Sequence, residues 1–309
     1  MMLTCRACGV TSEFKVFSAR EMQLGTREVF QYGECPNCLS LQITEIPPEL
    51  GKFYPKDYYS LQPPPERSKK PTFFKTLTAR WLLGGGALAA KVAKDKARRY
   101  PFFAWCRTAG AHLNSRLVDV GCGSGGLLRR MQRYGFSNLL GVDPFGLVEV
   151  DEPGFKIRCV DFAKIPGPFD LIMMHHVLEH LPDPVAGLVE ASDRLAPQGR
   201  ILVRIPVANS ETYRKYRENW YNLDPPRHLL IPSPKGMQIL AERSGLKVAD
   251  AGFDGIEVGY LYSEFYQADI PFSERPESSK GRKAYYRALA DAANARGEGD
   301  QGVFFLEKK

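Results

Sequence analysis

The segment that most constrains the fold of this chain is residues 117–128, LVDVGCGSGGLL. A short apolar run around one acid leads directly into a glycine-rich turn, which indicates a buried strand that enters a tight turn. Glycine is needed where the backbone approaches a ligand closely, because a side chain would block that approach. After the turn, apolar side chains recur at helical spacing, at Leu127, Leu128, Met131 and Tyr134. A strand, a glycine turn and a helix in this order predict a binding site for a small polar or anionic ligand.

Two nucleotide-binding patterns fit these glycines. Gly121, Gly123 and Gly126 fit the dinucleotide pattern G-x-G-x-x-G, whereas Gly121, Gly123 and Gly125 fit the G-x-G-x-G of class I methyltransferases. A match to either pattern alone is weak. Asp119 favours the second pattern, because at the end of the strand its carboxylate can accept a hydrogen bond from the amino group of S-adenosylmethionine (SAM). From this segment onward the chain resembles the SAM-dependent methyltransferases.

The rest of the chain alternates short apolar segments with helical ones. After the strand at 117–120 we expect further strands at residues 138–142, 155–160, 169–174, 200–207, 246–249 and 302–307. This alternation predicts an α/β fold, a doubly wound, seven-stranded, mostly parallel sheet that binds its ligands at the carboxyl ends of the strands. The resemblance implies a Rossmann-like class I methyltransferase domain over residues 111–309, with a helical insertion at 262–300 before the last strand.

Acidic residues follow the second and third strands as well as the first. Asp143 lies about 20 residues beyond the glycine turn, where an acid is placed to bind the ribose hydroxyls of an adenosine group. The resemblance implies that Asp161 contacts the adenine amino group and that Phe162 flanks the ring. A NAD-dependent enzyme would explain the region of the first two acids but not Asp161 and Phe162, so we expect SAM as the cofactor.

The histidines at residues 175–180, HHVLEH, follow the fourth strand. His176 to His180 reads H-x-x-E-H, the inverted metalloprotease pattern. Its position at the end of an apolar strand in a nucleotide-binding architecture disfavours that interpretation. The segment resembles instead the V-L-E-H of many SAM methyltransferases, which implies that it borders the methionine end of the cofactor. We therefore expect His176 to contact the cofactor, and His180 is a candidate general base.

His228 is the first candidate for the general base. Methyl transfer from a sulfonium requires an aligned acceptor and, for a hydroxyl acceptor, a group that removes its proton. Histidine commonly fills this role near neutral pH. His228 ends the segment 220–228, WYNLDPPRH, in which two prolines stiffen the backbone and Trp220 or Tyr221 is a candidate to stack on a sugar. The alternative is a structural brace in which His228 bonds to the backbone.

The N-terminal region contains two C-x-x-C pairs, formed by Cys5, Cys8, Cys35 and Cys38. Four thiolates in this arrangement match the tetrahedral coordination of structural Zn²⁺. Short strands expected between the pairs complete a zinc ribbon over residues 1–46. Disulfides are disfavoured because the sequence shows no secretion signal.

Positive charge is concentrated in one region. Twelve of the 42 Lys and Arg residues but only two of the 35 Asp and Glu residues lie within 66–116. This region therefore has a net charge of +10, and the other residues together have −3, which gives the total of +7. It overlaps an aromatic, proline-rich and basic linker that we expect over residues 47–110. The linker is either a solvated helical segment or a contact for an anionic partner, such as RNA or a lipid-linked glycan. No apolar run reaches the roughly 18 residues of a membrane span, and we expect a cytoplasmic protein.

The ribbon, the glycine turn and residues 220–230 together resemble a bacterial group of zinc-ribbon SAM methyltransferases. Members of this group are often associated with saccharide, O-antigen or sugar-nucleotide pathways. The resemblance implies O-methylation of a saccharide, sugar nucleotide or other small polar acceptor, because related sugar C-methyltransferases carry a further C-terminal domain that does not follow here. Two alternatives stay open, an RNA methyltransferase and a SAM-binding scaffold without catalytic activity.

Overall fold

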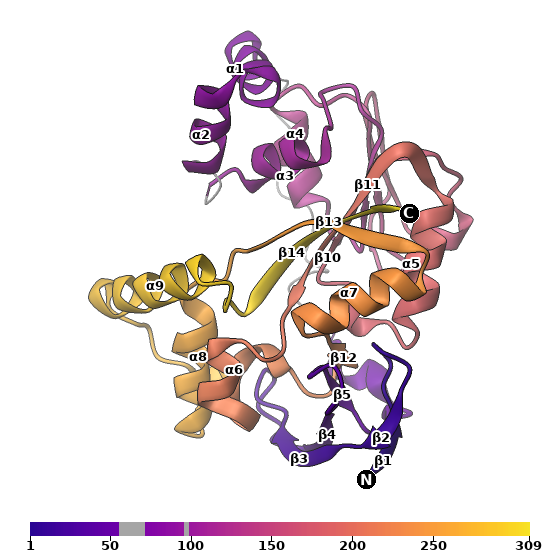
Figure 1. Cartoon of the computed structure of the whole chain (residues 1–309). Helices are drawn as coiled ribbons and strands as arrows, with labels where there is room; N and C mark the ends of the chain where they lie inside the picture. Colours follow the sequence, from indigo (N-terminus) through magenta and orange to yellow (C-terminus); the bar gives the residue numbers. More distant parts are fainter. Residues whose placement is uncertain (56–71, 96–98) are drawn as a thin grey trace. The chain divides into compact units, whose positions relative to one another are not determined.

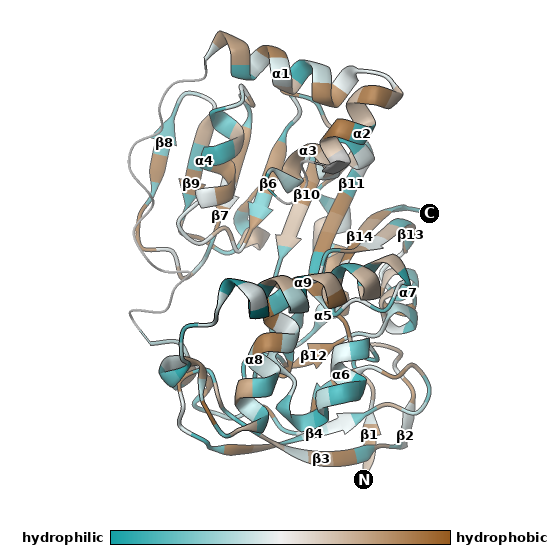
Figure 2. Cartoon of the chain, turned by 90° about the vertical axis from the view of Figure 1, so that its left-hand side faces the viewer, coloured by the Kyte–Doolittle hydropathy of each residue, from teal (hydrophilic) through white to brown (hydrophobic). Residues whose placement is uncertain are grey.

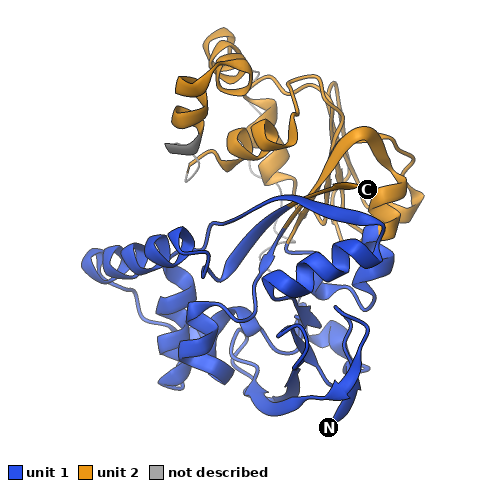
Figure 3. Ribbon diagram, viewed as in Figure 1, with its two compact units in different colours: residues 1–55, 176–188, 204–304 blue, residues 56–175, 189–203, 305–309 orange. Residues whose placement is uncertain are grey.

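The structure, a computed structural model, describes residues 1–55, 72–95 and 99–309 (Figure 1). The chain divides into two compact units, which Figure 3 shows in different colours. Unit 1 comprises residues 1–55, 176–188 and 204–304, and unit 2 comprises residues 56–175, 189–203 and 305–309. The expected boundaries after residues 46 and 110 stay a prediction, and residues 56–71 and 96–98 of the predicted linker lie outside the described residues.

Among the described residues, the central sheet has eight strands in the order β13-β14-β11-β10-β6-β7-β9-β8. Strand β6 pairs in parallel with β10 and β7, and β7 pairs in parallel with β9. The α/β class and the mostly parallel sheet are therefore confirmed. Its strands are β6 (Leu117–Val120), β7 (Leu139–Val142), β8 (Val150–Glu152), β9 (Phe155–Arg158), β10 (Phe169–His175), β11 (Leu195–Pro206), β13 (Leu246–Phe253) and β14 (Gln301–Lys308).

The eighth strand is the difference from the predicted seven. Strand β8 pairs antiparallel with β9, so the two form a hairpin at the edge of the sheet. Gly154 permits the tight connection because its φ of 76° lies in the left-handed region. The strand was not expected because three residues of mixed polarity carry no clear alternation.

Helices precede and follow the strands of this sheet. Strand β6 is buried along its whole length, and Leu128 and Met131 of α4 are fully buried beside the sheet. The register places Asp119 of β6 opposite Gly141 of β7 and Met173 of β10, so the carboxyl ends of these strands lie at one edge. The helices are α1 (Phe73–Gly84), α2 (Ala87–Asp95), α3 (Pro101–Ala109), α4 (Gly126–Gln132), α5 (Pro184–Asp193) and α7 (Pro234–Arg243).

The N-terminal region of unit 1 is built from two small sheets. Strands β1 (Met2–Thr4) and β2 (Thr11–Glu13) form an antiparallel hairpin. The second sheet has the order β12-β5-β4-β3 and is antiparallel in all three pairings. Its strands are β3 (Lys15–Arg20), β4 (Val29–Glu34), β5 (Leu41–Ile43) and β12 (Leu230–Ile231). Because β12 directly follows His228 and Leu229, the candidate catalytic segment is tied to the ribbon by main-chain pairing.

The other helices of unit 1 are α6 (Glu211–Tyr216), α8 (Glu257–Gln267) and α9 (Lys280–Ala295). Their apolar residues share a core with the ribbon and with the loop before β12, and this core includes Tyr32, Leu223, Leu229 and Tyr260. Short 3-10 turns occupy Leu50–Phe53, Phe162–Lys164, Leu178–His180, Arg217–Asn219, Tyr221–Leu223 and Phe272–Glu274. None of the helices within the described ranges combines the length and the apolar composition that crossing a bilayer requires.

Candidate active site

The glycine turn of unit 2 has a backbone that other residues would not adopt readily. Gly121, Gly123 and Gly125 have φ values of 67°, 51° and 74°, all in the left-handed region. A Cβ atom on Gly125 would also lie only 2.5 Å from Cδ1 of Ile157. The positive φ values and the lack of room for a Cβ atom therefore both favour glycine. Without side chains at these glycines, the backbone of the turn is open to close approach at the carboxyl end of β6.

Asp119 is a buried carboxylate at the same place. It is 4% exposed, and its Oδ1 atom has no hydrogen-bond partner among the described residues. Burial, and then the charge of Asp143, raise the pKa of Asp119 to about 8. A buried polar atom without a partner is unfavourable, so this oxygen is suited to a donor supplied by a ligand. The amino group of SAM has the required charge and hydrogen-bonding capacity.

Asp143 holds the glycine turn and the loop after β7 in place. Its Oδ2 accepts a hydrogen bond from the backbone N–H of Gly123 at 2.9 Å, and its Oδ1 accepts one from the N–H of Phe145 at 2.9 Å. A carboxylate has about four acceptor positions, so each oxygen retains capacity for a ribose hydroxyl. The position of Asp143 is compatible with its predicted contact to the cofactor.

The loop after Asp143 exposes apolar side chains that we did not single out from the sequence. Phe145, Leu147 and Val148 are 77%, 68% and 48% exposed. An available signal was the apolar character of residues 145–148 directly after an acid at a strand end, where a loop is expected to be polar. These side chains adjoin the acid that we expect to bind the ribose.

Asp161 and Phe162 differ in their exposure. Asp161 is exposed and its Oδ1 accepts a hydrogen bond from the N–H of Ala163 at 2.9 Å, so it caps the 3-10 turn that follows. Phe162 is buried, with its ring centroid 6.4 Å from that of Phe169. Their contacts with the adenine stay a prediction.

His176 is held by an ion network within unit 1. Its Nε2 lies 2.9 Å from Nη1 of Arg204, and its Nδ1 lies 3.1 Å from Oε1 of Glu179. Because a guanidinium can only donate, Nε2 accepts and Nδ1 carries the proton that is donated to Glu179. Both ring nitrogens therefore have protein partners, and the predicted contact of His176 with the cofactor stays a prediction. His175 belongs to unit 2, where its ring centroid lies 4.7 Å from that of Trp105.

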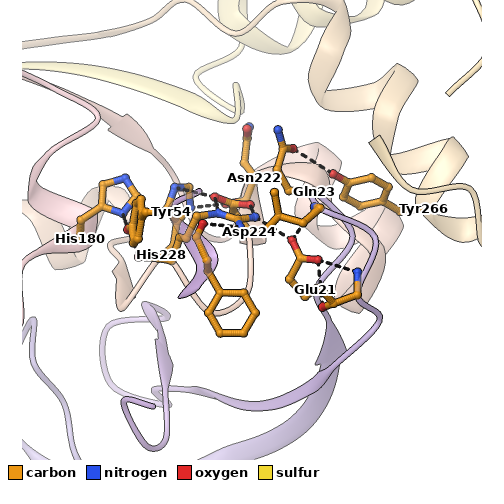
Figure 4. A network of polar contacts seen from close by, with 12 residues as sticks. Glu21, Gln23, Tyr54, His180, Asn222, Asp224, His228 and Tyr266 are labelled. Carbon is orange, nitrogen blue, oxygen red and sulfur yellow. Dashed lines mark hydrogen bonds and ion pairs between the residues drawn. The ribbon is translucent and has the colours of Figure 1, made fainter. Parts of the chain in front are cut away.

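His180 and His228 lie beside each other in unit 1, with ring centroids 4.9 Å apart (Figure 4). Nδ1 of His180 is 2.8 Å from the carbonyl oxygen of Arg227, and Nδ1 of His228 is 2.8 Å from the carbonyl oxygen of Asn222. A carbonyl oxygen only accepts, so in both rings Nδ1 carries the proton and the lone pair is on Nε2. The hydroxyl of Tyr54 lies 3.1 Å from Nδ1 of His180. The sequence predicts either histidine as a base, and the structure brings the two rings together.

The electrostatics of this cluster keep His228 neutral. Burial lowers its pKa to about 4, although the carboxylate of Asp224 opposes the shift. Glu179 is fully buried, and burial alone would raise its pKa, but the hydrogen bond from His176 and the nearby histidines lower it to about 2. One side-chain atom from each of Glu179, His180 and His228 lies within 4.8 Å of the others. A neutral imidazole beside a carboxylate is an arrangement that suits a general base.

A fully buried ion pair fixes the backbone before His228. Arg227 donates from Nη2 to Oε1 of Glu21 at 3.0 Å and from Nε to Oδ2 of Asp224 at 2.9 Å. It also donates from Nη1 to the carbonyl oxygen of Phe53 at 3.3 Å. The guanidinium outweighs the effect of burial and lowers the pKa of Asp224. Sequence reasoning missed Glu21, since no local pattern connects it with a residue 206 positions away.

Asp300 contacts two residues at the start of the segment 220–228. Oδ2 of Asp300 accepts a hydrogen bond from Nδ2 of Asn222 at 3.0 Å and lies 3.5 Å from Nε1 of Trp220. Trp220 is only 1% exposed, and its ring centroid lies 5.6 Å from that of Tyr213. The expectation that Trp220 stacks on a sugar is therefore wrong, because the indole fills the core of unit 1. Tyr221 is half-buried against Tyr262 and Phe272.

The four predicted cysteine ligands converge at one point of unit 1. The Sγ atoms of Cys5 and Cys38 are 3.6 Å apart, and those of Cys8 and Cys35 are 3.8 Å apart. Four sulfurs around one zinc ion at 2.3 Å have separations of roughly 3.8 Å. All four Sγ atoms lie within 4.8 Å of one another. The donor set and its spacing fit a closed tetrahedral Zn²⁺ site without an open position.

Comparison with known proteins assigns the family. Residues 88–251, more than half of the chain, match the family described as "Methyltransferase domain". The chain belongs to this methyltransferase family. The methyltransferase is 24% identical over 175 residues to the ubiquinone biosynthesis O-methyltransferase of Aeromonas salmonicida, covering 51% of this chain and 72% of the relative. It is 30% identical over 124 residues to the enzyme of the same name from Dechloromonas aromatica, covering 35% and 52%.

The curated relatives are matched over different shares of their length. The methyltransferase spans 72% of the relative from Aeromonas salmonicida but only about half of those from Dechloromonas aromatica and Acinetobacter baylyi. Among solved structures, a putative sarcosine dimethylglycine methyltransferase from Galdieria sulphuraria has a TM-score of 0.44 and 14% identity, over 72% of this chain and 86% of that one.

Proposed function

We propose that this methyltransferase transfers a methyl group from SAM to a hydroxyl group of a small polar acceptor, with a saccharide or sugar nucleotide as the expected class. The observation that carries the cofactor assignment is the buried Oδ1 atom of Asp119, which has no partner among the described residues beside a glycine turn. The names of the relatives, which describe O-methylation in ubiquinone biosynthesis, support oxygen as the methylated atom. The saccharide class rests on the resemblance of the sequence.

The proposal assigns cofactor binding to residues of unit 2. Asp119 would hold the amino group, and Asp143 would bind the ribose hydroxyls. Asp161 and Phe162 would contact the adenine, and the glycine turn would let the backbone approach the cofactor closely. The resemblance of residues 175–180 suggests that His176 would contact the cofactor. SAM, when bound, supplies a methyl group that is already activated on a sulfonium.

Proton removal is assigned to the histidines of unit 1. His228 is neutral near pH 7, and its tautomer leaves the lone pair on Nε2, so Nε2 can take the proton of an acceptor hydroxyl. His180 has the same tautomer and lies next to His228, which makes it the second candidate. Asp224, with Oδ2 3.7 Å from Nε2 of His228, would stabilise the imidazolium that forms.

We further propose that Cys5, Cys8, Cys35 and Cys38 hold a structural Zn²⁺ ion. A closed four-sulfur site offers no coordination position for a substrate, so its role is to stabilise the fold of the ribbon. Thiolates available for zinc persist in a reducing compartment, and this supports a cytoplasmic location.

Methyl-labelled SAM tests the proposal when it is incubated with the enzyme and separated cell fractions of glycans, lipids, RNA and small metabolites. We expect label in a glycan or small-metabolite fraction, and much less with the His228→Gln variant. Label confined to RNA, with a steep dependence on salt, would favour the RNA methyltransferase instead. SAM binding without transfer to any fraction would favour the non-catalytic scaffold.

A further inference from the structure

Helix α1 has a second apolar face that unit 2 does not cover. Phe73, Phe74, Leu77 and Trp81, hereafter the α1 ridge, are 76%, 78%, 52% and 43% exposed. At 100° per residue these four positions fall within an arc of about 100° on the helix. Ala79, Leu82 and Leu83 lie outside that arc and are buried. One face therefore anchors the helix, and the other presents three aromatic side chains and a leucine to solvent.

Positive charge borders the α1 ridge. Arg80 of α1 is exposed and lies about 20° from Phe73 around the helix, and Lys91 of the neighbouring helix α2 is also exposed. Lys75 is exposed as well, but it lies on the anchoring side, with Nζ 5.8 Å from the centroid of the Tyr134 ring. Leu88 of α2 is also 69% exposed. Residues 72–94 contain no Asp or Glu. The hydropathy colouring of Figure 2 shows apolar and polar residues mixed along α1 and α2.

We propose that the α1 ridge docks onto the surface of an anionic lipid bilayer. Aromatic side chains flanked by Lys and Arg characterise helices that lie in the interface, with the rings at the acyl boundary and the charges at the headgroups. The 12-residue helix is about 18 Å long, too short for the roughly 30 Å hydrocarbon core, so it lies in the plane of the membrane.

Charge complementarity decides between a bilayer and other occupants. A second copy of this chain would bring two cationic surfaces together, whereas anionic lipids neutralise the bordering Lys and Arg residues. RNA would match the charges, but it offers no apolar phase for the exposed leucines. The surface would bring the enzyme to acceptors carried by a lipid. Docking itself does not depend on methyl transfer.

Vesicle flotation of the full chain tests this inference. We expect binding to vesicles of equal parts phosphatidylglycerol and phosphatidylcholine, and much weaker binding to phosphatidylcholine alone. The Phe73→Ser/Phe74→Ser variant should lose binding by at least about tenfold, because two aromatic side chains leave the interface. Arg80→Gln/Lys91→Gln should lose the preference for anionic vesicles. SAM affinity and thermal unfolding should be unchanged in both variants.

Tyr285→Ser is the matched control, since Tyr285 is 61% exposed on α9 and far from the ridge in sequence. It should bind vesicles like the unmodified protein. Equal vesicle binding by Phe73→Ser/Phe74→Ser and the unmodified protein would overturn the inference. The inference would also be overturned if the unmodified protein did not bind vesicles but bound RNA or self-associated, and if the same substitutions abolished that RNA binding or self-association.

Discussion

Arg227 donates a hydrogen bond from Nη2 to Oε1 of Glu21 at 3.0 Å, and neither side chain is exposed to solvent. The two residues lie 206 positions apart in the chain, and the next residue after Arg227 is the candidate base. Glu21 also accepts hydrogen bonds from the backbone N–H groups of Leu24 and Thr26. The ribbon region therefore positions the backbone that orients His228.

Removing one partner of this buried pair should destabilise the protein. Glu21→Ala leaves Arg227 buried with Asp224 as its remaining carboxylate, and we expect a loss of about 3 kcal/mol in the free energy of unfolding. Denaturant unfolding measures this change. Glu28→Ala is the control, because its ion pair with Lys52 is nearly half-exposed and should contribute less than about 1 kcal/mol. Equal effects of the two substitutions would contradict the structural role of Glu21.

The pH dependence of turnover should reflect the low pKa of His228. Burial holds this pKa near 4, so kcat/KM for the acceptor, measured at saturating SAM, should stay level as the pH falls through 6.5, the ordinary histidine value. His228→Gln should reduce turnover by about 10²–10⁴-fold and leave the affinity for SAM unchanged. An acid limb at pH 6.5 in the unmodified enzyme, or full turnover in the variant, would argue against the base assignment.

The low pKa of His228 should also make the free energy of unfolding depend on pH. Between pH 4 and 6.5 the unfolded chain protonates at this position and the folded chain does not. The contribution of neutral His228 to the free energy of unfolding is therefore fully present above pH 6.5 and is lost as the pH falls toward 4. Denaturant unfolding of the unmodified protein and His228→Gln across this window should show a difference that grows at acidic pH. A difference in the free energy of unfolding that does not change with pH would contradict the low pKa of His228.

The buried carboxyl group of Asp119 should lower the free energy of unfolding of the ligand-free protein. The pKa of Asp119 in the folded protein is raised to about 8. Between pH 4 and 8 the unfolded chain loses this proton and the folded chain keeps it, so without ligand the free energy of unfolding falls as the pH rises through this window. The isosteric Asp119→Asn should therefore be more stable than the unmodified protein at pH 8, by more than about 1 kcal/mol. Thermal unfolding without ligand measures the difference. Asp161→Asn, at an exposed position, should not be stabilised.

Removing zinc should affect the two units differently. Metal analysis should find about one zinc ion per chain, as four thiolates imply. Cys35→Ser, or chelation, should release the ion and abolish turnover, because β5 and β12 link the ribbon to the His228 loop. SAM affinity should persist, since Asp119, Asp143 and the glycine turn belong to unit 2. Full turnover without metal would contradict this role.

Much of the sheet was predictable because its signals are local. The run before Gly121, the turn and the apolar spacing after it specify strand, turn and helix within 20 residues. The cluster of four cysteines was predictable for a similar reason, since paired C-x-x-C spacing is itself the signal. Strand β8 was not, because Val150–Glu152 becomes a strand only through its pairing with β9.

The surroundings of His228 could not be derived from the sequence. Glu21 and Asp300 reach the loop from distant positions in the chain, and a lone acid carries no periodicity that reveals its partner. The sequence offers Trp220 or Tyr221 as the residue that stacks on a sugar, because aromatic residues suit both stacking and a core, and only tertiary packing shows that Trp220 is buried. His180 and His228 were found singly, while their proximity depends on the fold.

Titration calorimetry with SAM at pH 7, in two buffers of different ionisation enthalpy, tests the central claim most directly. We predict that SAM binds with proton release, because its cationic amino group lowers the raised pKa of Asp119. Asp119→Asn should bind SAM at least about tenfold more weakly and without that release. Tight binding of NADH with none of SAM, or an unchanged SAM affinity in Asp119→Asn, would contradict the account.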